Sequence, residues 1–188
     1  VGIAVLDSGI NPEHPDVKGR IVKSENFVPN ETTTNDSYGH GTHVAGLTSA
    51  STDNSVGIVS LGFNTEIIAV KTVKDSDHES YMLYAYEGIE YAVRAGADII
   101  NLSWSSAAYN NRQKDIINYA INSGCIIVAA AGNFGNSNKT YPAAFDGVIA
   151  VGATDNYDRK IGKSSFGPWV DLMAPGDKIY STLAGSNS

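Results

Sequence analysis

The sequence predicts an α/β fold in three layers, with a mostly parallel β-sheet flanked by helices on both faces. Short apolar runs of strand length alternate along the chain with segments of helical spacing. The first run, residues 1–6, is apolar throughout, which is typical of a strand buried on both faces. The 188 residues contain no internal repeat, linker or low-complexity segment, so we expect one domain with a sizeable core.

The first half of the chain predicts strands at residues 21–27 and 66–73, which are short and rich in apolar and β-branched residues. A polar loop precedes a helix predicted at residues 40–50, where small residues recur. A second helix is predicted at residues 81–95 from apolar side chains at helical spacing, and it ends at Gly96; the side chains are those of Leu83, Tyr86, Ile89, Ala92 and Val93.

The second half continues the alternation. A helix at residues 112–122 stops near Gly124, and strands are expected at residues 97–102, 126–131, 148–153, 170–173 and 178–182. In parallel sheets ligands bind beyond the carboxyl ends of the strands. Asp7, the run Asn101-Leu102-Ser103 and the pair Gly132-Asn133 all follow strands in this way, so they are candidates for a functional site.

Composition excludes some classes of partner. The formal net charge is -7 and no block of Lys and Arg occurs, which argues against nucleic acid and anionic membranes and is compatible with cation binding. No apolar run is long enough to span a membrane. The single cysteine, Cys125, excludes an internal disulfide, and its place in an apolar strand predicts a buried, inert thiol.

A histidine opens the predicted helix at residues 40–50, within the stretch Tyr38-Gly39-His40-Gly41-Thr42-His43-Val44-Ala45-Gly46. Histidine carries protons near neutral pH, and a polar ring on a helix packed through small residues needs a partner. The carboxylate of Asp7, at the end of the first strand, is the candidate partner of His40. We interpret His43 as a core or hydrogen-bonding histidine, since a metal site with His40 has no evident third ligand.

Four stretches together resemble one family, the subtilisin-like serine proteases or subtilases. They are Asp7-Ser8-Gly9, His40-Gly41-Thr42-His43-Val44-Ala45-Gly46, Asn101-Leu102-Ser103 and Ala130-Ala131-Gly132-Asn133, in the family's order and spacing. Met173-Ala174-Pro175-Gly176 matches a fifth stretch. The resemblance covers essentially the whole chain and implies a serine endopeptidase with a triad in the chain order Asp, His, Ser.

The resemblance assigns roles to three side chains. Asp7 would orient the ring, His40 would act as general base and then general acid, and the amide of Asn133 would donate to the oxyanion. Taken alone, Asp-Ser-Gly at a strand end is more often a turn cap, and Gly-Asn is a frequent turn pair.

Substrate binding is also implied by the resemblance. An extended polypeptide would pair with a segment walling the pocket for the residue before the cut, and a propeptide inhibitor is a further expected partner. The assigned residues are Ser103, Trp104, Ser105, Ala130 and Gly132. Ser105 and Ser106 stand where many members have glycines, so we expect a narrower pocket mouth. His78-Glu79-Ser80 departs similarly on the opposite edge, and would favour basic substrate side chains.

Structural calcium is the expected cofactor. The resemblance implies a tight site with side-chain oxygens of Asp16 and Asn54 and backbone carbonyls of Thr52, Val56 and Ile58, all hard oxygen ligands. A plain surface loop is the alternative. An N-terminal residue that often completes the site is missing, so affinity would be reduced. A weaker cation site is implied near Ala143, Phe145, Val148 and Asp171.

The serine nucleophile of the family lies in a Gly-Thr-Ser-Met-Ala stretch, which residues 1–188 do not contain. Ser186 and Ser188 have neither that motif nor a helix. We therefore expect residues 1–188 to be a partial catalytic domain, without its N-terminal segment and its serine-bearing part, and inactive by itself. Secretion is expected, with an intracellular location left open.

We weigh two alternatives. One is a non-catalytic subtilase relative that uses its cleft for binding or regulation, and the other is a dinucleotide-binding domain. The second needs Gly-x-Gly-x-x-Gly after the first strand, where the sequence is Asp7-Ser8-Gly9-Ile10-Asn11-Pro12, and we set it aside.

Overall fold

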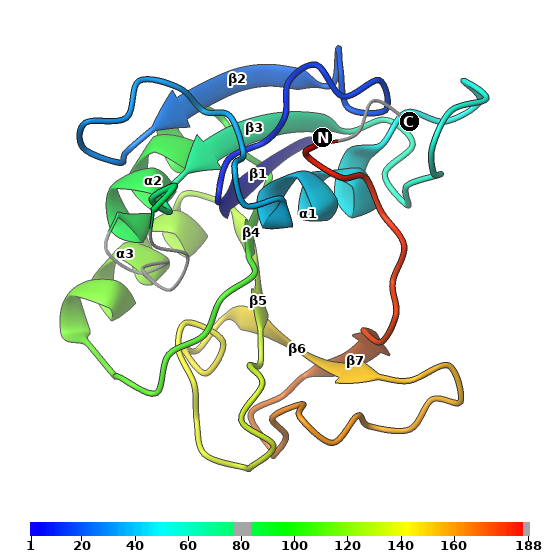
Figure 1. Ribbon diagram of the computed structural model, residues 1–188. Helices are drawn as coiled ribbons and strands as arrows, with labels where there is room; N and C mark the ends of the chain where they lie inside the picture. Colours follow the sequence, from blue (N-terminus) through cyan, green and yellow to red (C-terminus); the bar gives the residue numbers. More distant parts are fainter. Residues whose placement is uncertain (77–83, 186–188) are drawn as a thin grey trace. The chain divides into compact units, whose positions relative to one another are not determined.

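The computed structural model describes residues 1–76 and 84–185 (Figure 1). The chain divides into two compact units. The first comprises Val1–Asn101 together with Tyr180–Ser188, and the second comprises Leu102–Ile179.

The sheet of the first unit has the order β2-β3-β1-β4. Its strands are β1 (Gly2–Asp7), β2 (Ile21–Asn26), β3 (Glu66–Lys71) and β4 (Ile99–Leu102), the last of which reaches the boundary of the unit. Strands β1 and β3 are parallel and in register from Gly2↔Glu66 to Asp7↔Lys71, and β2 is parallel to β3. The carboxyl ends of β1 and β3 therefore carry an acid and a cation side by side.

Two helices cover opposite faces of this sheet. Ala45 of α1 (His40–Ser49) packs in one core cluster with Val5 and Ala69. Gly88 of α2 (Ala85–Arg94) lies instead against Leu6, with Val70 also close. Because successive side chains of a strand point to opposite faces, α1 and α2 lie on different sides of the sheet. The prediction of helices on both faces is confirmed.

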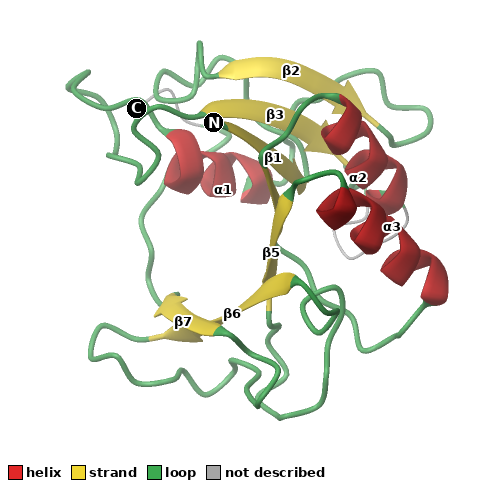
Figure 2. Cartoon of the chain, turned by 180° about the vertical axis from the view of Figure 1, so that it is seen from behind, coloured by secondary structure: helices red, strands yellow, loops and turns green. Residues whose placement is uncertain are grey.

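The second unit contains a parallel sheet in the order β5-β6-β7. Its strands are β5 (Ile126–Ala130), β6 (Val148–Thr154) and β7 (Leu172–Pro175), and its helix α3 (Asn111–Asn122) packs on β5. The side chain of Asn110 accepts a hydrogen bond from the Arg112 backbone N–H and so caps α3. Figure 2 shows that loops make up most of the remaining chain between these strands.

Most predicted elements are present, with bounds shifted by one or two residues. The helix predicted at residues 81–95 begins at Ala85, and residues 81–83 lie outside the described part. The strand predicted at residues 178–182 is wrong. There Ser181 Oγ and Thr182 Oγ1 donate to the carbonyls of His43 and Thr42, each at 2.6 Å, so side chains fasten this segment to α1 and no strand ladder forms.

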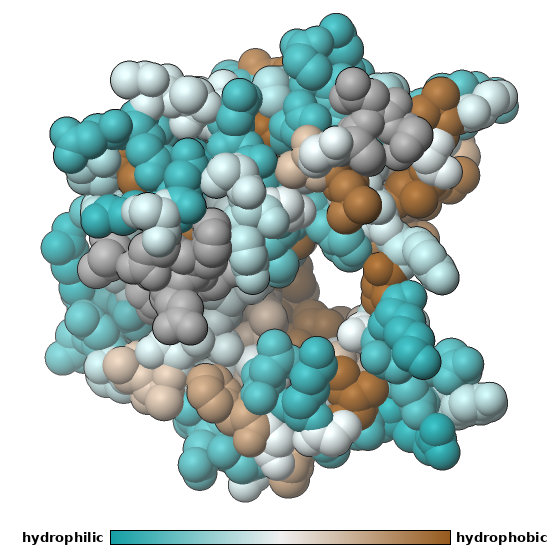
Figure 3. Space-filling model, viewed as in Figure 1, coloured by the Kyte–Doolittle hydropathy of each residue, from teal (hydrophilic) through white to brown (hydrophobic). Residues whose placement is uncertain are grey.

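The surface in Figure 3 is mostly hydrophilic, with apolar residues in separate patches. Within residues 1–76 and 84–185, none of the helices combines the length and the apolar character that crossing a bilayer requires. Cys125 is buried, as the sequence predicts.

Candidate active site

The structure brings Asp7 and His40 into direct contact. Nδ1 of His40 lies 2.8 Å from Oδ1 and 2.9 Å from Oδ2 of Asp7. Because an ionised carboxylate only accepts hydrogen bonds, Nδ1 carries the proton and donates it to Asp7. Asp7 is fully buried at the carboxyl end of β1, and His40 is the first residue of α1. A strand end and a helix start therefore meet at one hydrogen-bonded pair.

Glycine makes this contact sterically possible. A side chain at Gly41 would collide with the carbonyl oxygen of Gly9, and its Cβ would lie 3.0 Å from the Cβ of Asp7. Gly9 itself has φ +103°, a conformation that favours glycine. The small residues of the Asp7 and His40 stretches thus let the first turn of α1 rest on the end of β1.

The pKa of His40 is raised above 6.5, chiefly by its hydrogen bond to Asp7. Burial of the ring opposes this shift, and the negative charges of Asp7 and then Asp36 add to it. The His40 side chain keeps 37% of its surface exposed. The ring is therefore accessible to solvent although its Nδ1 is hydrogen-bonded to Asp7.

Two charged residues beside this pair were not found from the sequence. Asp36 is a buried carboxylate that bonds to the loop ahead of α1 and to Ser8. Lys71 is only 1% exposed, and its Nζ donates to the carbonyls of Ser8 and Asn35, both at 2.9 Å, and to Asp75 at 2.6 Å. A lysine that ends an apolar strand is the one sequence signal for such a buried, paired cation.

Asn133 belongs to the second unit, where it follows β5 and its side chain is exposed. Gly132 precedes it with φ +92°, and the Gly132 carbonyl accepts a hydrogen bond from the Ser165 N–H at 2.9 Å. Ala131 donates to the Val151 carbonyl at 2.8 Å. The two residues that precede Asn133 are therefore each held by a backbone hydrogen bond to a neighbouring segment.

The other candidate substrate-binding residues also lie in the second unit. A Cβ at Gly132 would lie 2.6 Å from Ser105 Oγ, so the Ser105 side chain covers the space above Gly132. Ser106 exchanges two backbone hydrogen bonds with Tyr141, at 2.9 and 2.8 Å. Trp104 is buried, whereas Ser103 and Ala130 are partly exposed. The proposed edge residues His78, Glu79 and Ser80, and Ser186 and Ser188, lie outside the described residues.

The candidate calcium loop is folded around Asp16 in the first unit. Asp16 is fully buried; its Oδ1 accepts from Asn54 Nδ2 at 2.8 Å and its Oδ2 from the Ile58 N–H at 2.7 Å. Asp53, Ser55 and Gly57 all have positive φ, and a side chain at Gly57 would collide with the Asp16 carboxylate. The loop thus curls tightly over one buried acid. Among the described residues, no group of three or more His, Cys, Asp and Glu side chains could hold a metal.

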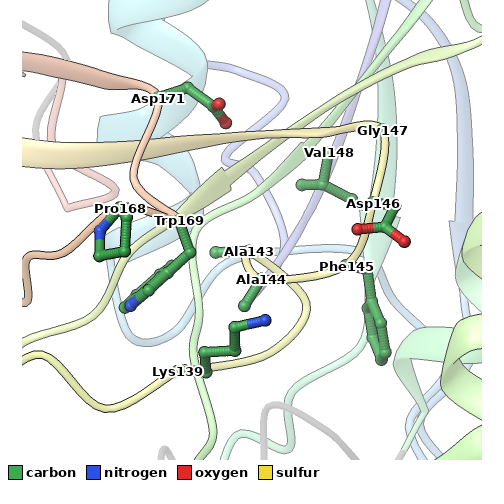
Figure 4. A pocket seen from close by; sticks show the side chains of 10 residues that line it. All are labelled: Lys139, Ala143, Ala144, Phe145, Asp146, Gly147, Val148, Pro168, Trp169 and Asp171. Carbon is green, nitrogen blue, oxygen red and sulfur yellow. The ribbon is translucent and has the colours of Figure 1, made fainter.

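A pocket of about 360 Å³ occupies the second unit (Figure 4). It contains all four residues of the weaker candidate cation site, Ala143, Phe145, Val148 and Asp171, together with Lys139 and Trp169. One carboxylate oxygen of Asp171 accepts from the Ala150 N–H at 2.8 Å. The structure therefore brings these four residues together, but it also places a lysine among them.

The raised pKa of His40 predicts a pH-dependent contribution to stability. The Asp7–imidazolium pair stabilises the fold fully below the unfolded-state pKa of 6.5, and this contribution is lost as the pH rises through the higher folded-state pKa. The difference in free energy of unfolding between the unsubstituted protein and His40→Gln should be largest near about pH 5 and should shrink toward about pH 9. Urea denaturation across this range measures it.

The same comparison made in an Asp7→Asn background is the control, because the charge that favours imidazolium is then gone. There the difference should vary much less with pH. If, in the protein that keeps Asp7, the difference in free energy of unfolding rises with pH, the raised pKa of His40 is contradicted.

Comparisons with known proteins agree on one family. The model of the subtilase family (Peptidase_S8) matches residues 1–188. The chain is 42% identical over 184 residues to a thermophilic serine proteinase of Bacillus sp. (strain AK1), covering 98% of this chain and 46% of that protein. It is equally similar, at 42% identity over 184 residues, to thermitase of Thermoactinomyces vulgaris, of which it covers 66%.

A solved structure supports the same relation. The crystal structure of a cold-adapted subtilisin-like serine proteinase matches with a TM-score of 0.86 at 28% identity, over 97% of this chain and 65% of that one. The chain thus spans about half to two thirds of the length of these relatives. On the family model, the identities and the shared fold, the chain belongs to the subtilase family.

Proposed function

We propose that residues 1–188 supply three catalytic groups of a serine endopeptidase: the carboxylate that orients the histidine, the histidine that acts as general base and general acid, and the oxyanion donor. The observation that carries the proposal is the contact of His40 Nδ1 with both carboxylate oxygens of Asp7. With the proton held on Nδ1, Nε2 is the nitrogen that accepts a proton from an attacking hydroxyl. His40 then returns that proton to the leaving amine, and the amide of Asn133 donates to the oxyanion formed on the scissile carbonyl.

The nucleophile is not assigned to any residue of this chain. The segment Ser181 to Ala184 is held on α1 by the two hydroxyl contacts described above, and on the loop after β1 by Asn11 Nδ2, which donates to the Ala184 carbonyl at 2.8 Å. In Figure 1 this red segment ends beside α1. This segment therefore lies against the helix that begins with His40.

The proposed substrate is an extended polypeptide that pairs with Ser103 to Ser105 and faces Gly132 and Ala130. Since the Ser105 side chain covers Gly132, we infer a preference for a small or medium residue before the cut. Action outside the cell and inhibition by a propeptide remain proposals that rest on the family alone.

A fluorophosphonate probe, which reacts covalently with activated serines, tests the function. It should leave the 188-residue polypeptide unlabelled and should label a longer polypeptide from the same gene that carries a serine segment. In that longer polypeptide His40→Ala should reduce the labelling rate by about a thousandfold or more. His43→Ala, on the same helix, is the matched control and should keep most of it.

Each outcome separates the alternatives. Labelling of the 188 residues contradicts the absence of a nucleophile. A longer polypeptide that folds but stays unlabelled favours the non-catalytic relative.

We also propose that the loop around Asp16 binds structural calcium. The chemistry fits: a fully buried carboxylate and a tightly curled loop with positive φ angles, whose backbone carries carbonyl groups, offer hard oxygen ligands. Asp16 and Asn54 would bind through side-chain oxygens, and Thr52, Val56 and Ile58 through carbonyls. The Asn54 amide now donates to Asp16, so its oxygen would have to turn toward the ion. At the second site Lys139 would weaken cation binding.

Calcium should raise the melting temperature of the protein by roughly 5 °C or more at saturation, because a ligand that binds only the folded state stabilises it. Asp16→Asn should remove most of this increase. Asp53→Asn is the matched control, since Asp53 lies in the same loop with its side chain exposed and asparagine tolerates its φ of 60°. Equal calcium responses of the two variants would rule out Asp16 as a ligand.

A further inference from the structure

A second carboxylate, that of Asp36, lies buried at the start of α1 with only 8% of the residue exposed. It accepts five hydrogen bonds. Oδ1 accepts from Ser8 Oγ at 2.8 Å, Tyr38 N at 3.1 Å and Gly39 N at 2.7 Å. Oδ2 accepts from the backbone N–H and the hydroxyl of Thr42, at 2.8 and 2.7 Å. These donors come from both segments that carry the Asp7–His40 pair.

Ser8 is the link between the two segments. Ser8 directly follows Asp7, and its N–H donates to Asp7 Oδ1 at 2.8 Å. Its hydroxyl donates to Asp36 and accepts from the N–H of Gly41, the residue after His40, at 2.9 Å. The backbone on each side of the pair is therefore held by one short chain of hydrogen bonds that meets at Asp36.

We propose that Asp36 is a positioning residue that fixes the end of β1 against the first turn of α1 and so sets the geometry of the Asp7–His40 contact. The importance of this positioning for catalysis rests on the function proposed above. The contacts of Asp36 do not rest on that function, because they are observed wholly within the first unit.

A carboxylate suits this place for two reasons. The N-cap residue of α1 is Gly39, which has no side chain to accept the first N–H groups, and the first turn contains no acid. Asp36 and the Ser8 hydroxyl take up the N–H groups of Thr42 and Gly41 instead, and a negative charge near a helix N-terminus is stabilising. Asparagine would turn an NH2 group toward one set of these donors, since every partner of Asp36 donates.

The pKa of His40 can report on the positioning role of Asp36, because several charges surround the ring. Asp7 touches the ring, Asp36 adds negative charge from the loop ahead of α1, and the Tyr38 ring stacks on His40 with centroids 6.4 Å apart. Lys71 brings a positive charge to the Ser8 carbonyl from the end of β3. Movement of β1 relative to α1, or loss of the Asp36 charge, should therefore change the titration of His40.

The test is an NMR titration of His40 in the 188-residue protein with labelled histidine, assigned by His40→Gln. Asp36→Asn should lower the pKa of His40, since both its charge and its acceptors are lost. Ser8→Ala keeps the charge and breaks only the link, and it should lower the pKa by less. Asp98→Asn is the matched control, because Asp98 Oδ2 accepts from the Gly2 N–H at 2.8 Å at the opposite end of β1. It should leave the titration of His40 unchanged.

A merely structural role would reduce the melting temperature in Asp36→Asn and Asp98→Asn alike without moving the pKa of His40, and that result overturns the proposal. If Asp36→Asn does not fold, Ser8→Ala decides: an unchanged His40 titration in that variant overturns the proposal as well. The titration needs neither substrate nor nucleophile. Its failure is therefore distinguishable from failure of the proposed function, which the serine probe reports separately.

Discussion

The hydrogen bond between the Asp7 carboxylate and the His40 ring is the interaction around which the candidate active site of the first unit is arranged. It requires the first turn of a helix to lie directly on the end of a buried strand, which a side chain at Gly41 would prevent. It also requires a charge to be fully buried. Hydrogen bonds from His40 and the Ser8 N–H compensate the burial of Asp7, and Lys71 adds a cation held on the Ser8 carbonyl.

The groups proposed for catalysis are divided between the two units. The acid and the base lie in the first unit, whereas Asn133 and the strand-pairing residues lie in the second. This division follows from the chain order of a parallel sheet, in which each strand end contributes one short segment.

The sequence predicted the residues whose place follows from local pattern. Asp7 ends an apolar run and His40 begins a helix of small residues, and their pairing was predicted because a polar ring on such a helix needs a partner and because the stretches resemble the subtilases. Asp36 could not be predicted in this way, because it lies in a polar loop and its partners come from Ser8 and Thr42. The strand prediction at residues 178–182 was wrong for a related reason. Their apolar and β-branched content suits a strand, but the hydroxyls of Ser181 and Thr182 bind carbonyls of α1.

The contact with Asp7 fixes the proton of the neutral His40 ring on Nδ1. Nitrogen-15 NMR of the histidine ring, recorded above its pKa, tests this most directly, because protonated and unprotonated ring nitrogens have well-separated shifts. The structure predicts a protonated Nδ1 and an unprotonated Nε2 at His40. A proton found on Nε2, with Nδ1 unprotonated, would show that Asp7 does not accept a hydrogen bond from the ring.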